Sequence, residues 1–259
     1  MACVAWLSQA TQATAEQQAK NMRKVQFVKG NFYHIYNRGV EKRSIFEDDN
    51  DMWRFLQALF LFNDERTTTN LLWQMEKKRG KVTFGVLKEF FIKEKRNRDP
   101  LVRISADCLM CNHFHLLVEE IKEGGISRFM HKLGTGYTEY FNHKYQRVGS
   151  LFQGPFKACL IDNERYLEYL LFYINVLNPA ELVEPQIKKE GVRDIERVLR
   201  FCREYPWSTH QEYLGLRNSI IVDKGLLGEI FQDPQKYEKM AIDFLIARKF
   251  DLISPYILE

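Results

Sequence analysis

Apolar and strand-forming side chains gather in four stretches of the chain. The first, VQFVKGNFYHIYNRG at 25–39, contains a Gly-Asn turn followed by an extended run that ends at Gly39. The others lie at 101–110, 113–118 and 150–161. Their composition and the turn residues between them predict strands that are well separated along the chain.

Three further stretches place apolar side chains three and four positions apart, which is the spacing of a helix face. They cover residues 49–63, 124–146 and about 164–177. Asp48 or Asp49 suits the cap of the first helix and Asp162 that of the third. We expect Asn178-Pro179 to end the third helix, because proline cannot continue the hydrogen-bond ladder.

The order of these elements predicts the fold class and the domain limits. Strands near both ends of the first part, with helices between them, predict an α+β sandwich whose helices lie on one face of the sheet. Residues 1–21 have little periodicity, and Met22 is an alternative start, so we expect a flexible tail there. The main domain is then 22–185, with a charged helical insert at 64–99 and a helical C-terminal extension at 186–259.

Positive charge is concentrated in two parts of a mildly basic chain. The 259 residues carry a net charge of +4, and 45% of them are hydrophobic, which is enough for a packed core. Residues 76–98 hold nine Lys and Arg against three Asp and Glu, and residues 128–157 hold five against one. The second segment also contains many aromatic residues, a combination that favours single-stranded nucleic acid over a simple solvated face.

The cysteines and the hydropathy point to an intracellular protein. The five cysteines are scattered and odd in number, which does not suggest a disulfide framework. No apolar run approaches the length of a membrane span, and no secretory signal is visible. We therefore expect a cytoplasmic protein that does not enter a membrane.

The segment CNHFHLLVEE at 111–120 contains the strongest candidate for chemistry. In a strand, His113 and His115 share one face and Phe114 takes the other, so both imidazoles can converge on one divalent cation. Two alternatives stay open on these residues alone. One is a structural zinc site completed by Cys108 and Cys111, and the other is a pair of buried histidines satisfied by hydrogen bonds.

Four blocks in a fixed order resemble the IS200-like single-tyrosine (HUH) transposase family, in particular its REP-associated branch. The resemblance spans roughly residues 25–185. The blocks are FYHIYNRGVEKRSIF (32–46), CLMCNHFHLLV (108–118), GGISRFMHKLGTGYTEYFNHKYQRVGSLFQGPFKA (124–158) and YLLFYINVLNP (169–179).

The resemblance implies a ferredoxin-like antiparallel sheet and an HUH nuclease site. By position, His113 and His115 become metal ligands, Tyr173 becomes the nucleophile and Asn178 becomes a metal-proximal polar group. The expected cofactor is Mg²⁺ or Mn²⁺, towards which oxygen and imidazole ligands point. The implied activity is that of a transposase, which nicks and rejoins single-stranded DNA beside hairpins through a 5′-phosphotyrosine intermediate.

This chain departs from the family pattern at three positions. Tyr173 and Asn178 are five residues apart, where the family usually has four, so a regular helix would turn them about 140° from each other. A helical bulge would absorb the extra residue, and such bulges favour functional sites. Without a bulge, Asn178 is only a residue that ends the helix. Cys111 and Pro155 stand where the family usually carries a proline and often an arginine.

The resemblance and the charge pattern together suggest which residues contact DNA. The candidates are Asn37, Arg38, Lys132, Lys144, Arg147 and Lys157. A non-catalytic protein that binds DNA hairpins is the first alternative, and a metallohydrolase that uses water is the second. Homodimers and monomers both fit the family, so oligomeric state stays open.

Overall fold

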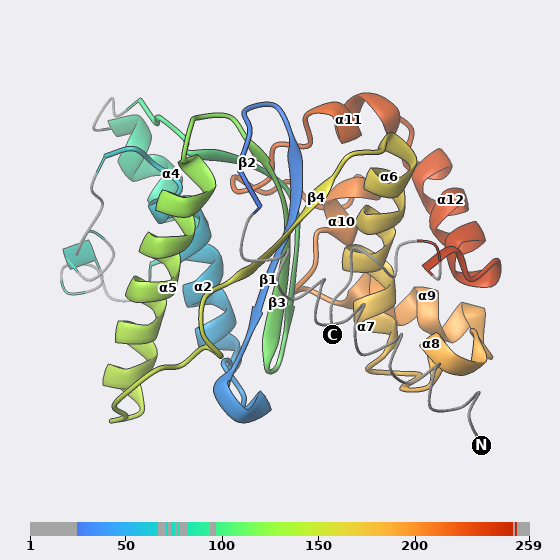
Figure 1. The fold of residues 1–259 in the computed structure, drawn as a ribbon, viewed down its shortest axis with the longest axis horizontal. Coiled ribbons are helices and arrows are strands. Elements are labelled where there is room, and N and C mark those ends of the chain that lie inside the picture. The colour runs from blue at the N-terminus through green and yellow to red at the C-terminus, as the bar shows by residue number, and fades with distance from the viewer. Residues whose placement is uncertain are drawn as a thin grey trace, which may run out of the picture.

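The computed structural model places a sheet between two groups of helices (Figure 1). It describes residues 25–66, 71, 74–75, 77, 82–93, 97–250 and 252. The predicted tail at 1–21 and parts of the charged insert at 64–99 lie outside these residues. No helix within the described ranges is long and apolar enough to cross a bilayer.

The sheet has four antiparallel strands in the order β2-β3-β1-β4. The strands are β1 (Phe32–Arg38), β2 (Val102–Met110), β3 (His113–Glu120) and β4 (Lys157–Ile161). Helix α2 (Asp49–Phe62) connects β1 towards β2, and α5 (Gly125–Lys144) connects β3 to β4. This strand–helix–strand–strand–helix–strand order with this pairing is the ferredoxin-like fold, so the expected α+β class is confirmed.

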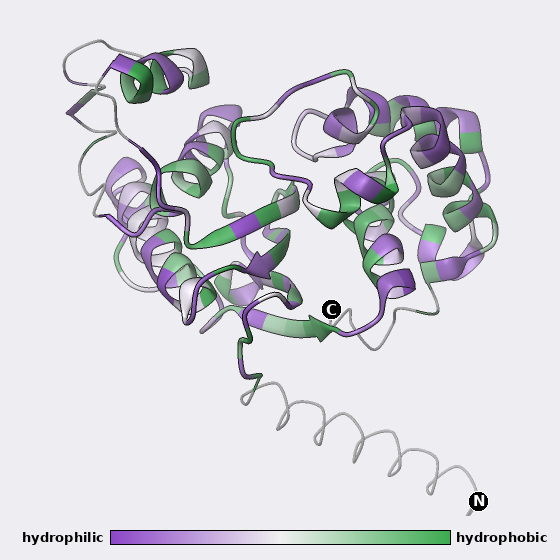
Figure 2. Ribbon diagram, turned by 90° about the horizontal axis from the view of Figure 1, so that it is seen from above, coloured by the Kyte–Doolittle hydropathy of each residue, from purple (hydrophilic) through white to green (hydrophobic). Residues whose placement is uncertain are grey.

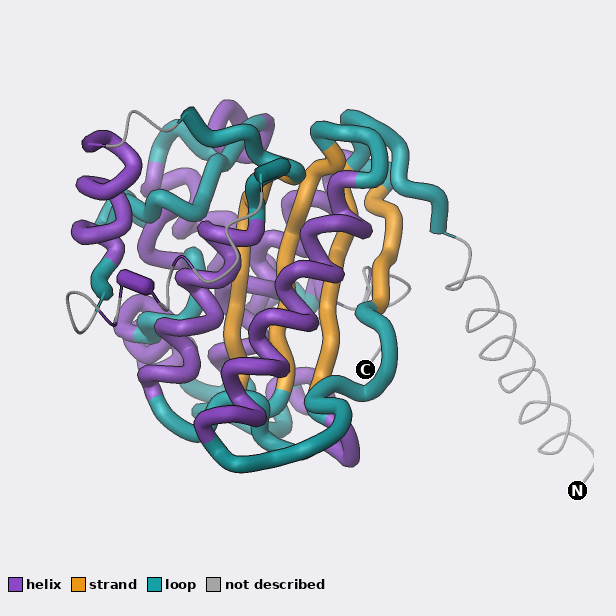
Figure 3. Tube along the Cα trace, turned by 90° about the vertical axis from the view of Figure 1, so that its left-hand side faces the viewer, coloured by secondary structure: helices purple, strands orange, loops and turns teal. Residues whose placement is uncertain are grey.

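Helices α2 and α5 cover one face of the sheet, as expected (Figure 3). Phe114 of β3 lies 4.9 Å from the ring of Phe55 on α2, which in turn lies 4.9 Å from the ring of Tyr137 on α5. The side chain of Asp48 caps α2 by accepting a hydrogen bond from the Asp51 amide. A short 3-10 turn, η2 (Val40–Lys42), leads into α2, and α4 (Phe84–Lys93) packs on its far side.

The opposite face is covered by the end of the main domain and by the C-terminal extension (Figure 2). Helix α6 (Glu164–Phe172) runs into the π-helix η3 (Tyr173–Leu177) and the short α7 (Asn178–Ala180). The extension then adds α8 (Ile187–Glu190), α9 (Ile195–Glu204), α10 (His210–Tyr213), α11 (Leu226–Ile230) and α12 (Pro234–Ile246).

Two local predictions about the third helix were wrong. The cap is Asn163 and not Asp162, because the Asn163 side chain accepts hydrogen bonds from the amides of Arg165 and Tyr166. Pro179 does not end the helix, which continues to Ala180. Proline is tolerated there because the Asn175 carbonyl, four residues earlier, receives a hydrogen bond from the Ser208 hydroxyl at 3.4 Å.

The C-terminal extension also covers one edge of the sheet. The Leu109 amide donates to the carbonyl of Trp207 at 2.8 Å, and the Thr209 amide donates to the carbonyl of Asp107 at 3.0 Å. Ser208 forms a bridge with Cys108 between these two bonds. Residues 207–209 thereby satisfy backbone groups that an edge strand would otherwise leave open.

The carboxyl group of Asp107 makes the covered edge sensitive to pH. Burial, followed by repulsion from Glu212, raises the pKa of Asp107 to about 7, against the weaker opposing effect of Arg217. The folded protein then keeps a proton that the unfolded chain has already released. The free energy of unfolding therefore falls as pH rises from about 4 to about 7.

We expect Asp107→Asn to remove this pH-dependent loss. Urea unfolding at pH 5 and at pH 8 gives the free energy of unfolding of both proteins. The difference between variant and wild type should shift in favour of the variant by up to about 3 kcal/mol from pH 5 to pH 8, at about 1.36 kcal/mol per pKa unit. A difference between the two proteins that does not change with pH would contradict the assignment.

Candidate active site

The two histidines of β3 share the face that meets η3. Their rings lie 5.0 Å apart between centroids and are almost perpendicular, at 87°. Phe114, between them, points to the other face and packs against Phe55 and Phe152. The predicted alternation of side chains along this strand is confirmed.

Tyr173 is the first residue of η3 and lies directly against His115. Its ring centroid is 5.5 Å from that of His115 and 6.0 Å from that of His34. The tyrosine is completely buried. The fold therefore brings together the three residues that the resemblance implies as ligands and nucleophile, although their roles stay predictions.

The π-helix resolves the unusual spacing between Tyr173 and Asn178. The Asn178 amide donates to the carbonyl of Tyr173, five residues back, as a π-turn requires. The extra residue is absorbed within this turn, so Asn178 returns to the side of the helix that carries Tyr173. The helical bulge, one of the two possibilities that the spacing left open, is therefore present.

Unsatisfied buried atoms at this site fit a divalent cation. Among the described residues, Nε2 of His115 and both side-chain polar atoms of Asn178 are buried without a hydrogen-bond partner. Buried polar atoms normally have partners, and exceptions often mark an ion. Imidazole nitrogen and amide oxygen suit Mn²⁺ or Mg²⁺, so the residues fit the expected group.

The protonation state of His115 agrees with this fit. Burial, followed by the charges of His113, His34 and Lys188, lowers the pKa of His115 well below its usual value. The ring therefore stays neutral near neutral pH, which is the form that binds a metal.

The alternative of a structural zinc site is contradicted. Within the described ranges, no group of three or more His, Cys, Asp or Glu side chains could hold a metal ion. Cys111 lies away from the histidines, with its sulfur 3.2 Å from the Ser44 hydroxyl, and Cys108 is a free, buried thiol.

A buried polar network from the C-terminal extension holds the π-helix. Asn175, in the middle of η3, donates from Nδ2 to the Tyr237 hydroxyl at 3.1 Å and accepts from the Thr209 hydroxyl at 2.6 Å. His210 lies 2.9 Å from the same Tyr237 hydroxyl. Sequence reasoning missed this role of residues 186–259.

Lys188 is a further charged residue that sequence reasoning missed. Its ammonium nitrogen lies 5.2 Å from the centre of the Tyr173 ring and 3.1 Å from a carboxylate oxygen of Glu181. Arg248 donates to the carbonyls of Lys188 and Lys189 at 3.0 Å, which ties α8 to the chain after α12. The extension thus adds positive charge beside the tyrosine.

Lys157 is a predicted DNA contact that lies close to the histidine face. It begins β4 opposite Tyr36, which pairs in turn with His115 on β3. The ammonium nitrogen lies 5.8 Å from the centre of the Tyr36 ring, and the residue is exposed.

Two other predicted contacts are already engaged within the protein. Lys144 forms ion pairs with Asp48 at 3.0 Å and with the fully buried Asp51 at 2.7 Å, and these partners raise its pKa despite the cost of burial. Lys132 donates to three backbone carbonyls between Asp64 and Arg66. Both side chains hold the ends of α2 and α5 together.

The remaining predicted contacts lie near the end of β1 and after α5. Asn37 is nearly buried and donates to the Gly154 carbonyl at 3.2 Å, while Arg38 donates to the Gln153 side chain at 2.5 Å. Arg147 is half-buried, donates to Asn142 at 3.1 Å and stands over the ring of Phe141. Arg38 and Arg147 keep part of their surface open to solvent.

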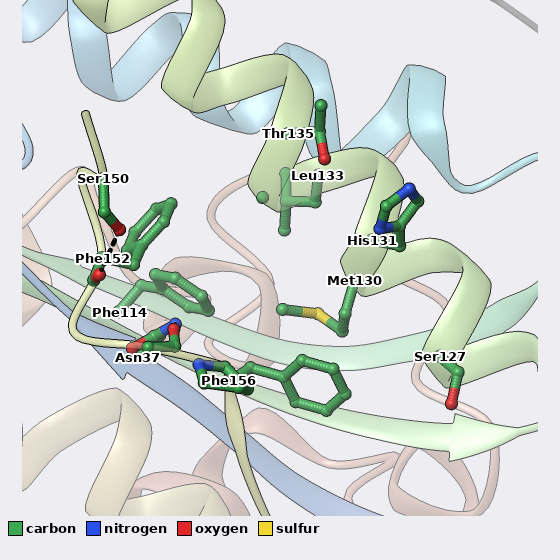
Figure 4. A pocket seen from close by; sticks show the side chains of 13 residues that line it. Asn37, Phe114, Ser127, Met130, His131, Leu133, Thr135, Ser150, Phe152 and Phe156 are labelled. Atoms are coloured by element: carbon green, nitrogen blue, oxygen red, sulfur yellow. Dashed lines mark hydrogen bonds between the residues drawn. The ribbon is translucent and has the colours of Figure 1, made fainter. Parts of the chain in front are cut away.

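A pocket of about 310 Å³ opens on the other face of the sheet, between α5 and the loop before β4 (Figure 4). Phe114, Phe152, Phe156 and Met130 form its apolar wall. Most of the other aromatic residues between 128 and 157 belong to the core and are not open to stack on unpaired bases. The core members are Phe129, Tyr137 and Phe141.

Comparison with known proteins confirms part of the resemblance. Residues 70–176 match the family model described as "Transposase IS200 like", a range that includes His113, His115 and Tyr173. No curated protein matches the chain. A solved structure described as the REP-associated tyrosine transposase bound to a REP hairpin is 14% identical to this chain, with a TM-score of 0.41. The match covers 77% of this chain and 92% of the chain in that structure.

The network around Asn175 should behave as one energetic unit. Tyr237→Phe and Thr209→Val each leave a buried polar atom of Asn175 without a partner, so each should lower the free energy of unfolding by about 1–3 kcal/mol. Because both bonds hold the same side chain, the double variant should lose less than the two single losses together. Urea denaturation of the four proteins tests this, and strictly additive losses would contradict it.

Proposed function

We propose that the protein is a metal-dependent endonuclease and strand transferase that acts on single-stranded DNA beside hairpins. The observation that carries this proposal is the position of Tyr173, whose ring lies 5.5 Å from His115. The family match over residues 70–176 supports a transposase-like activity. The unsatisfied atoms of His115 and Asn178 support a cation at the same place.

In the proposed reaction, the Tyr173 oxygen attacks the phosphorus of a phosphodiester. A bond forms between tyrosine and the 5′-phosphate, and the bond from phosphorus to the 3′-oxygen breaks. The tyrosine loses its proton and the departing 3′-oxygen gains one. The covalent link conserves the energy of the phosphodiester, so the strand can be rejoined without ATP.

His113, His115 and Asn178 would hold the cation, and Lys188 would assist the nucleophile. A bound Mg²⁺ or Mn²⁺ supplies Lewis-acid polarisation of the phosphate. A tyrosine hydroxyl is a weak nucleophile, since its usual pKa is about 10. The Lys188 ammonium, 5.2 Å from the Tyr173 ring, stabilises the negative charge that develops on the tyrosine oxygen.

One observation favours a second candidate function, a non-catalytic protein that binds DNA hairpins. Tyr173 is fully buried, so a phosphodiester cannot reach its hydroxyl in the arrangement described here. A binding protein would keep the tyrosine as a core residue and use the exposed charges around Lys157 and Arg38 for DNA.

A covalent adduct distinguishes the two functions. Purified protein, Mn²⁺ and single-stranded hairpins from the flanks of its own gene should give a protein–DNA adduct that survives denaturing electrophoresis. Tyr173→Phe should abolish the adduct, while Tyr166→Phe and Tyr169→Phe on the same helix should retain it. His115→Ala should also abolish it, because the cation site is then incomplete.

The other outcomes decide between the alternatives. Cleavage that persists in Tyr173→Phe without an adduct would replace the tyrosine mechanism with hydrolysis by water. Hairpin binding without cleavage by the wild type would identify a binding protein.

Lys157 and Lys144 form a matched pair for testing DNA contact. Lys157→Gln should weaken binding to single-stranded DNA and reduce the slope of log K against log salt by about 0.7, the value for one phosphate contact. Lys144→Gln should leave this slope unchanged. It should instead lower the free energy of unfolding by about 1.5–3 kcal/mol, because Asp51 loses a charged partner. Equal salt slopes for wild type and Lys157→Gln would remove Lys157 from the interface.

A further inference from the structure

Each histidine of the pair has its Nδ1 atom held by a different neighbour. Nδ1 of His113 lies 2.7 Å from Oδ1 of Asn112. Nδ1 of His115 lies 2.9 Å from Nε2 of His34. The other ring nitrogen of His115, Nε2, is buried without a hydrogen-bond partner among the described residues.

The contacts of Asn112 determine which nitrogen of His113 carries the proton. The amide nitrogen of Asn112 donates to the Lys42 carbonyl at 3.1 Å, so its oxygen is the atom that faces His113. An amide oxygen only accepts hydrogen bonds. Nδ1 of His113 must therefore donate, and Nε2 keeps its lone pair when the ring is neutral.

His34 stands in the same relation to His115. It lies on β1, two residues before Tyr36, the strand partner of His115, and it is fully buried. Its ring stacks on Tyr36 at 4.9 Å and on His115 at 5.1 Å, which fixes its orientation. Whether His34 accepts or donates at Nε2 decides which tautomer His115 adopts.

Burial favours acceptance by His34. If His34 donated, Nε2 of His115 would carry a hydrogen in a place where no acceptor lies among the described residues. A buried donor without a partner is costly. If His34 accepts, the unpartnered atom is a lone pair directed from a buried, neutral ring, which is what a cation binds.

We propose that His34 and Asn112 are positioning residues, which hold His115 and His113 as Nδ1–H tautomers so that the lone pair of each neutral ring lies on Nε2. The metal part of this assignment rests on the proposed function, whereas the tautomers are a property of the metal-free protein. Residues outside the histidine motif then set the geometry of the site before any metal binds.

Nuclear magnetic resonance of the metal-free, full-length protein tests the tautomers directly. With ¹⁵N-labelled histidine, long-range ¹H–¹⁵N spectra should show Nδ1–H forms for His113 and His115. His34→Phe should shift the His115 resonances alone, and Asn112→Leu those of His113 alone. An Nε2–H form of His115 in the wild type would overturn the assignment.

Mn²⁺ affinity, followed by electron paramagnetic resonance of the free ion, tests the consequence. His34→Phe and Asn112→Leu should each weaken binding about 10–100-fold, the usual effect of losing an orienting partner. His34→Gln, whose amide reaches the position of Nε2 and can accept, should stay within about threefold of the wild type. His131→Gln, an exposed histidine on α5 at the other face of the sheet, should change nothing.

The two readouts separate the possible failures. Equal Mn²⁺ affinity for His34→Phe and wild type, or equal losses for His34→Phe and His34→Gln, would overturn the positioning role. Circular dichroism identifies any variant that fails to fold, and the Gln variant then carries the test. A wild type with Nδ1–H tautomers that binds no Mn²⁺ would overturn the proposed metal function while leaving the hydrogen-bond assignment in place.

Discussion

The alternation of side chains along β3, a strand buried on both faces, governs the rest of the structure. Phe114 points into the packed layer of α2 and α5, and its neighbours His113 and His115 point to η3. A shift of pairing by one residue would exchange these faces, and it would place imidazoles in the aromatic core. The apolar packing of Phe114 against Phe55 therefore also fixes which way the histidines point.

The opposite face is built by a part of the chain that has no counterpart in the ferredoxin-like unit. A bare sheet face with two histidines and a tyrosine would expose the site to water. The C-terminal extension covers it, satisfies the edge of β2 through residues 207–209 and reaches Asn175 through Thr209 and Tyr237. Water-excluded surroundings strengthen electrostatic interactions inside the site, and the fully buried Tyr173 lies within them.

Most of the sheet and much of the site could be predicted from the sequence, because both depend on local signals. Strand composition, the cap at Asp48 and the His-x-His spacing each act within a few residues. Contacts between residues far apart in the sequence could not be predicted from such signals. Nothing near Lys144 in the sequence marks Asp51 as its buried partner, and nothing near Pro179 shows that Ser208 takes over the bond proline cannot make. The five-residue spacing was the exception, because helix geometry alone required a bulge if the two residues were to share a face.

The π-turn at Tyr173–Leu177 lets the helix contain one more residue without rotating the side chains that follow it. One residue added to a regular α-helix rotates everything beyond it by about 100°. Here the addition is confined to a single wide turn, and the residues after it resume the direction they would have had without it. A chain can thus gain or lose one residue at this point and still present the same side chains to the sheet. Variation in length between related chains is therefore structurally tolerable in the element that carries Tyr173.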